Sequence, residues 1–351
     1  SLGYSETGGS LDLREEIAKL YGPAIKAKNI VIFPGAQTGM TLTAQALLTQ
    51  GDHAIIITPS YQTLELSAKH AGSEITRVAL SPDNDWQIDI AAIEAAIQDN
   101  TKYIALNDPH NPSGALMSEE SKRCLIKLAD KHNILIFSDE VYRLLELNSS
   151  DRSPSMADLS DKAIALGTMS KPFGAGGTGV GWVACQDLAV KEKLRKVQHI
   201  NAVCVSKAGE IQALMALRAK DKIVGKNMKI IKKNLVLLTR FFEKNDDLFE
   251  WVRPVAGCTG FVKFKGPHTG DELAAQLLEQ GILVFPSSIF DCDHDLKQYF
   301  RIGFSRKTMP VALKAFEKFV QAYRDEWGYA EVPSIPLAKS VNMLGRVGLW
   351  S

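Results

Sequence analysis

Four short apolar runs in the first half of the chain are each followed by residues that could do chemistry. Asn111, Asp139 and Lys171 follow three of them, and the turn Gly35-Ala36-Gln37 follows the fourth. The runs are 103–106, 134–137, 163–166 and 30–33. Because the carboxyl ends of parallel strands lie at one edge of an open α/β sheet, we expect these residues to meet there. The spacing of 32 residues between Asp139 and Lys171 (171 − 139) is typical of one strand–helix–strand unit.

These groups together are what pyridoxal phosphate requires of a protein. A desolvated lysine is a nucleophilic amine, so Lys171 is predicted to form a Schiff base with the cofactor. Asp139 is predicted to keep the ring nitrogen protonated, and Asn111 and Tyr142 to bind the ring oxygen. The turn Gly35-Ala36-Gln37 leads into a helix, whose free amides and dipole favour a phosphate.

Each feature also has a simpler interpretation when it is considered alone. The turn could begin an ordinary helix that Gln37 or Thr38 caps. Asp139 could cap a helix, bind a metal ion or pair with a cation. Lys171 could be a solvated surface residue.

The elements needed to position these residues are predicted from apolar periodicity. Strands and helices alternate over about 180 residues, which favours a three-layer α/β/α sandwich with a mostly parallel sheet, although an unrelated two-layer α/β protein has the same pattern. Long helical stretches over 206–219 and 229–245 then lead to a smaller C-terminal α+β unit. The predicted organisation is an N-terminal segment at a dimer interface, a large cofactor-binding domain, a small domain and a tail of unknown role, at 1–20, 21–220, 221–328 and 329–351.

Composition excludes several classes of protein. The chain has 351 residues and 45% apolar residues, and its net charge is only +1, so it is not disordered and has no basic field for nucleic acid. Five widely spaced cysteines without a CxxC motif indicate reduced thiols. No apolar run is long enough to cross a membrane, and no secretory leader opens the chain, so we expect a cytoplasmic protein without a bound metal.

Seven segments in order resemble the fold-type I pyridoxal-phosphate enzymes of aminotransferase class I/II. They are Gly3-Tyr4 with Leu13-Arg14, Pro34-Gly35-Ala36-Gln37, Pro59-Ser60-Tyr61, His110-Asn111-Pro112-Ser113-Gly114, Ser138-Asp139-Glu140-Val141-Tyr142, Ser170-Lys171 and Phe300-Arg301-Ile302-Gly303-Phe304-Ser305. The resemblance implies that Tyr61 stacks on the cofactor ring as part of the catalytic set. It implies that Tyr4 reaches the cofactor phosphate of a neighbouring subunit and the substrate, in a homodimer with shared active sites. It also implies that Arg301 binds the substrate α-carboxylate, with Asn111 beside it.

The sequence departs from the family pattern at two places. Gly179 stands where the family has an arginine that binds the cofactor phosphate. We expect either that Lys207 of the partner subunit replaces it, or that Thr168, Ser170, Thr178 and backbone amides suffice. The family also has an N-terminal arm before Tyr4, which this numbering lacks, so the chain is predicted to be shorter than a complete family member.

The resemblance implies reaction at the Cα of an L-amino acid through a Schiff base and a quinonoid intermediate. Its default outcome is transamination to an oxo acid. The alternative is elimination or cyclisation of a hydroxylated arginine-type amino acid, because the sequence also resembles a subgroup with capreomycidine and enduracididine synthase-like cyclases. Glu6 is then a candidate partner for the guanidinium, or else a solvated loop residue. A catalytically silent sensor domain is a third possibility.

Overall fold

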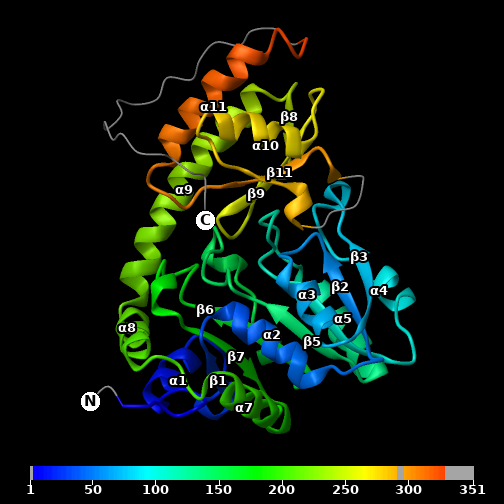
Figure 1. Cartoon of the computed structure of the whole chain (residues 1–351), viewed down its shortest axis with the longest axis vertical. Coiled ribbons are helices and arrows are strands. Elements are labelled where there is room, and N and C mark those ends of the chain that lie inside the picture. The colour runs from blue at the N-terminus through cyan, green and yellow to red at the C-terminus, as the bar shows by residue number, and fades with distance from the viewer. Residues whose placement is uncertain (1–2, 291–295, 329–351) are drawn as a thin grey trace.

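The structure, a computed structural model, describes residues 3–290 and 296–328. Its main feature is a seven-stranded sheet in the order β1-β7-β6-β5-β4-β2-β3 (Figure 1). The strands are β1 Ile30–Phe33, β2 His53–Thr58, β3 Glu74–Ala79, β4 Thr101–Asn107, β5 Leu135–Asp139, β6 Ala163–Thr168 and β7 Gly181–Cys185. Strand β7 runs antiparallel to both of its neighbours, β1 and β6, and the other four strand pairs are parallel, so the predicted mostly parallel sheet is confirmed.

Helices cover both faces of this sheet because consecutive strand residues pack in opposite directions. In β1, Val31 and Phe33 belong to one core cluster, whereas Ile30 and Ile32 belong to another. The first face is covered by α2 Ala36–Leu47, α3 Thr63–His70 and α7 Leu188–Ala202. The second is covered by α1 Leu11–Ala18, α4 Ile90–Ala95, α5 Glu119–His132 and α8 Lys207–Arg218, with the one-turn α6 Met156–Leu159. The three-layer sandwich is therefore confirmed.

A second, four-stranded antiparallel sheet forms the smaller unit, in the order β10-β11-β9-β8. Its strands are β8 Phe249–Trp251, β9 Thr259–Phe264, β10 Phe285–Pro286 and β11 Tyr299–Gly303, with helices α10 Gly270–Glu279 and α11 Met309–Tyr323. The 25-residue helix α9 Lys220–Lys244 runs from α8 up to this unit (Figure 1). The predicted boundary between residues 220 and 221 falls at the start of α9. The domain limits stay a prediction, and the predicted tail 329–351 lies outside the described residues.

Some predicted elements differ from the structure for identifiable reasons. The apolar residues 282–285 predict a strand of that length, but β10 begins only at Phe285. The amides of Gly281 and Ile282 donate instead to the carbonyls of Leu278 and Leu277 and complete the end of α10. Ser10 precedes α1 but its side chain makes no capping hydrogen bond; its amide donates to the Glu210 carboxylate at 2.7 Å instead. Helix α7 was not predicted, although Val190, Leu194 and Val197 have helical spacing.

Candidate active site

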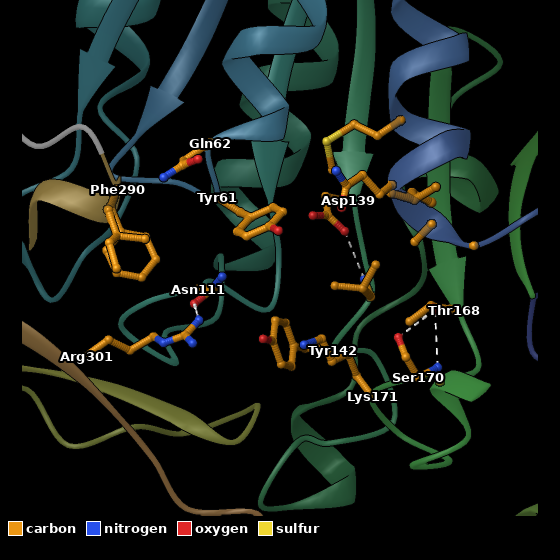
Figure 2. Close-up of a pocket in the computed structure, with 18 of the residues that line it drawn as sticks. Tyr61, Gln62, Asn111, Asp139, Tyr142, Thr168, Ser170, Lys171, Phe290 and Arg301 are labelled. Atoms are coloured by element: carbon orange, nitrogen blue, oxygen red, sulfur yellow. Dashed lines mark hydrogen bonds between the residues drawn. The ribbon is translucent and has the colours of Figure 1, made fainter. Parts of the chain in front are cut away.

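A cavity of about 540 Å³ opens at the carboxyl ends of β4, β5 and β6, next to the start of α2 (Figure 2). It is lined by eleven of the fourteen predicted site residues: Gly35, Ala36, Gln37, Tyr61, Asn111, Asp139, Tyr142, Thr168, Ser170, Lys171 and Arg301. The expectation that the strand ends bring Asp139 and Lys171 together is therefore confirmed.

Asp139 is the last residue of β5 and is only 5% exposed. Its Oδ1 accepts a hydrogen bond from the Val141 amide at 3.2 Å. Burial raises the pKa of this carboxyl from 3.8 to about 7, although the Val141 amide and the Lys171 ammonium act in the opposite direction. A buried carboxylate with so little compensation is suited to a cationic partner, such as a protonated ring nitrogen.

The loop after β4 is held against the end of β5 by one asparagine. Asn107 Nδ2 donates to the Asp139 carbonyl at 2.7 Å, and Asn107 Oδ1 accepts from the Asn111 amide at 2.6 Å. Asn107 therefore fixes Asn111 relative to Asp139.

Buried His110 fixes the same loop from the other side. Its Nε2 lies 2.8 Å from the Pro59 carbonyl, which can only accept, so this nitrogen has the proton and Nδ1 accepts from the Ser113 hydroxyl at 2.6 Å. Burial lowers the pKa of His110 to about 4, so its ring is neutral at neutral pH.

Lys171 lies across the cavity from Tyr61 (Figure 2). Its Nζ is 5.5 Å from the centre of the Tyr142 ring. The hydroxyls of Thr168 and Ser170 are 2.8 Å apart, and the Ser170 amide donates to Thr168 Oγ1 at 3.2 Å. The pKa of Tyr142 is raised, mainly by burial. Its phenol therefore stays protonated and can donate a hydrogen bond.

The start of α2 is a fitting site for a phosphate. Gly35 occupies the N-cap position with φ of 92°, and no side chain caps the helix. The Thr38 hydroxyl donates backwards to the Pro34 carbonyl at 3.1 Å, so capping by Gln37 or Thr38 is wrong. A Cβ on Gly181 of β7 would lie 2.4 Å from the Ala36 nitrogen, so only glycine lets this turn approach the sheet. The residues of this turn line the same cavity as Thr168 and Ser170, whose hydroxyls are further donors for an anion.

Arg301 lies in β11, paired in register with Phe285 of β10 and Phe261 of β9. It is 7% exposed, and its Nη1 donates to Asn111 Oδ1 at 3.0 Å. Its buried Nε has no hydrogen-bond partner, and no carboxylate within the described ranges forms an ion pair with it. Burial also lowers the pKa of this guanidinium, because removing the charge from water disfavours the protonated form. A bound carboxylate would provide the missing partner.

Three predicted site residues lie away from the cavity of their own chain. Tyr4 is 92% exposed. Glu6 forms an ion pair with Arg14 at 2.7 Å, and Lys207 Nζ lies 3.5 Å from the Glu210 carboxylate. The roles of Tyr4 and Lys207 in a partner's site, and of Glu6 toward substrate, stay predictions.

Sequence reasoning missed the residues that close the cavity opposite its phosphate end. They are Gln62, Phe285, Ile289 and Phe290, with Met40, Val141, Leu166, Gly176 and Val180 elsewhere in the wall. Residues 285–290 are a mostly apolar run, which sequence alone does not distinguish from core.

Other kinds of site have little support in the part of the chain that the structure describes. No group of three or more His, Cys, Asp or Glu side chains is placed to bind a metal ion there. Over the same residues, the helices are all too short or too polar to cross a bilayer.

Comparisons with known proteins agree with this geometry. The family profile described as aminotransferase class I and II matches residues 1–316. A probable aspartate aminotransferase from Methanocaldococcus jannaschii is 27% identical over 87% of this chain and 81% of its own length. The capreomycidine synthase of Streptomyces vinaceus is 27% identical over 77% of this chain and 68% of its own. The crystal structure of a PLP-dependent aminotransferase from Streptococcus suis superposes with a TM-score of 0.85 and 29% identity, over 92% of this chain and 84% of that one.

Proposed function

Because the chain belongs to the aminotransferase class I and II family, whose cofactor is pyridoxal phosphate, we propose that it transfers the α-amino group of an L-amino acid to an oxo acid. One observation is the main support for this proposal. A lysine amine, a buried carboxylate and a buried guanidinium line a single cavity, as Lys171, Asp139 and Arg301, and the guanidinium has no acidic partner among the residues that the structure describes.

The bound cofactor would supply a ring that accepts electrons from the substrate. Arg301 binds the substrate α-carboxylate through its planar fork, and Asn111 orients that fork. Asp139 holds a proton at the ring nitrogen, while the Tyr142 hydroxyl and the side-chain amide of Asn111 bind the ring oxygen. Tyr61, which is 43% exposed, covers one face of the ring.

Lys171 has the remaining chemical task in this proposal. As a general base, its Nζ takes a proton from the substrate Cα. As a general acid, it then gives that proton to a carbon of the cofactor. The half-buried lysine lies in the same cavity as Arg301, which holds the substrate by its carboxylate. Binding at Arg301 therefore fixes where the Cα is presented to Lys171.

A second candidate function is elimination or cyclisation of a hydroxylated arginine-type amino acid. The relative named capreomycidine synthase favours it. Gly179 favours it as well, because an uncharged residue lines the cavity where the family has a phosphate-binding arginine, and this departure points to a specialised enzyme. Glu6 is already paired with Arg14, so its carboxylate is not free to bind the guanidinium of a substrate. A silent sensor domain has the least support, since the cavity keeps Lys171, Asp139 and Arg301.

A single-turnover experiment tests these functions. The cofactor-loaded enzyme is mixed with one amino acid at a time, without an oxo acid. Transamination transfers the amino group to the cofactor, so its visible spectrum changes and one equivalent of oxo acid forms. A product that retains its α-nitrogen and forms over many turnovers without an acceptor would replace transamination by cyclisation or elimination.

The assembly is proposed to be a cytoplasmic homodimer. Exposed apolar side chains lie on α1, α7 and α8, as Leu11, Ile200 and Met215, and Ile200 is 85% exposed. Helices α1 and α8 pack together, and the Thr7 hydroxyl lies 3.2 Å from His199 of α7. Such a group of exposed apolar residues favours contact with another chain. Light scattering of Met215→Glu beside the unmodified protein tests this, since the dimer should weaken.

A further inference from the structure

The proposed function gives a role to each charged residue in the described part of the cavity lining. Among the described residues that line it, Asp139, Lys171 and Arg301 are the ones with a formal charge. The first faces the ring nitrogen, the second is the reacting amine, and the third binds the α-carboxylate. No charged residue of the described lining is left to pair with a charged substrate side chain.

The wall around Arg301 is apolar. The guanidinium carbon of Arg301 lies 4.5 Å from the centre of the Phe285 ring and 5.4 Å from that of Phe290. Phe290 is 2% exposed and packs edge-on against Phe261, with ring centres 5.8 Å apart, so its position is fixed by the core. Half-buried Ile289 also lines the cavity. Figure 2 shows Phe290 near Arg301 and Gln62, on the side away from Thr168 and Ser170.

The described polar groups beyond this wall are neutral or already paired. Gln62 contributes an uncharged amide. A smaller cavity of about 190 Å³ adjoins through Gln62 and Phe290 and reaches the buried carboxylate of Glu65. That carboxylate accepts from Arg77 at 2.8 and 3.0 Å and also pairs with Lys69. Among the residues that the structure describes at this end of the site, a cationic side chain would therefore find no free acid.

We propose that the substrate is an L-amino acid with a large, uncharged, apolar side chain, and that Ile289 is a specificity-determining residue for it. This inference rests on the proposed function and narrows its substrate class. A charged side chain buried against Phe285, Ile289 and Phe290 without a partner would lose its hydration and gain nothing in return. An apolar side chain would instead gain from leaving water.

Binding of unreactive acids tests the subsite apart from turnover. Phenylpropanoate, succinate and guanidinobutanoate each have a carboxylate for Arg301 but lack the amino group. Calorimetry on the cofactor-loaded enzyme should show phenylpropanoate binding at least about tenfold more tightly than either of the others. Equal or tighter binding of succinate or guanidinobutanoate would overturn the proposal.

Two arginine substitutions locate the effect at Ile289. Ile289→Arg places a cation in the cavity, so succinate binding should tighten about tenfold while phenylpropanoate binding weakens. The matched control is Leu66→Arg, because Leu66 is 53% exposed on α3 and lines only the adjoining cavity. An equal gain for succinate in both variants would mean a general charge effect and would remove Ile289 from the proposal.

The single-turnover reaction separates this inference from the proposed function. Phenylalanine, leucine, aspartate and arginine are supplied one at a time, and the change in the cofactor spectrum is followed. Fastest conversion with phenylalanine or leucine supports the apolar subsite. Fastest conversion with aspartate or arginine overturns the subsite but keeps the aminotransferase. If no amino acid changes the spectrum, the proposed function fails, and this inference fails with it.

Discussion

Arg301 Nη1 donates to Asn111 Oδ1 at 3.0 Å, and this contact joins the small sheet to the loop after β4 of the large sheet. The two residues are 190 positions apart in the chain. Asn111 is in turn fixed to Asp139 through Asn107, so one series of hydrogen bonds connects the proposed carboxylate site with the proposed ring-nitrogen site. Substrate and cofactor are thereby positioned by a single network.

The first prediction concerns the shape of the Arg301 side chain. In Arg301→Lys the charge is kept, but the planar fork that binds both a carboxylate and Asn111 is lost. We expect KM for the amino acid to rise about 10- to 100-fold with a smaller change in kcat. Steady-state kinetics measures this, with exposed Arg253→Lys as the control. An unchanged KM would contradict the role of Arg301.

The second prediction follows from the raised pKa of Asp139. The folded, cofactor-free protein keeps a proton on this carboxyl up to about pH 7, whereas the unfolded chain loses it near pH 4. The folded state thus binds more protons between these values, and its free energy of unfolding falls as the pH rises through this window. Asp139→Asn, which cannot ionise, should lack this fall and be more stable than the unmodified protein at pH 8.

Cofactor binding should change in the opposite direction. Asparagine provides no negative charge for the protonated ring nitrogen, so Asp139→Asn should bind the cofactor more weakly while its cofactor-free form is more stable. Urea denaturation at pH 5 and pH 8, with and without cofactor, measures both quantities. Asp99→Asn, at an exposed site, is the control and should show neither change. A destabilised Asp139→Asn at pH 8 would contradict the argument.

Much of the fold and of the cofactor end of the site could be predicted from sequence because the signals are local. An apolar run followed by Asp139 or by Ser170-Lys171 marks a strand end directly. Phe285 lines the site through its register opposite Arg301, which depends on strand pairing across the small sheet. Ile289 and Phe290 then follow from that placement, so no local pattern could have revealed them.

The third prediction concerns the approach of the α2 turn to the sheet. In Gly181→Ala the new Cβ would lie 2.4 Å from the Ala36 nitrogen, so the turn at Gly35 has to move. We expect clearly weaker cofactor binding, measured by equilibrium dialysis. In Gly225→Ala the new Cβ meets open space within α9, and the higher helix propensity of alanine should add up to about 1 kcal/mol of stability. Equal cofactor affinity in both variants would contradict the proposed phosphate site.

The fourth prediction tests Lys207. It lies outside its own chain's cavity and near Glu210, so any role at the phosphate requires a partner subunit. If it has that role, the unmodified protein should bind the cofactor more weakly once it is diluted below the dimer dissociation constant. Lys207→Ala should bind the cofactor more weakly at all protein concentrations, and its affinity should depend less on protein concentration. Lys222→Ala, an exposed lysine of α9, is the control. Unchanged affinity in Lys207→Ala would leave the phosphate to Thr168, Ser170, Thr178 and backbone amides.

The last prediction restores a charge at the phosphate end. Gly179 lines the cavity with φ of 61°, and a Cβ added there meets no atom within 4 Å. Gly179→Arg should therefore fit, at a backbone cost of about 1–2 kcal/mol for a side chain in the left-handed region. A guanidinium beside a phosphate dianion should outweigh that cost at low salt and slow the loss of cofactor during dialysis. Gly177→Arg is the matched control, because its Cβ also meets open space but the residue does not line the cavity. Equal cofactor loss from both variants would show that position 179 does not reach the phosphate; slower loss from Gly179→Arg alone, diminishing as salt is added, is the expected result.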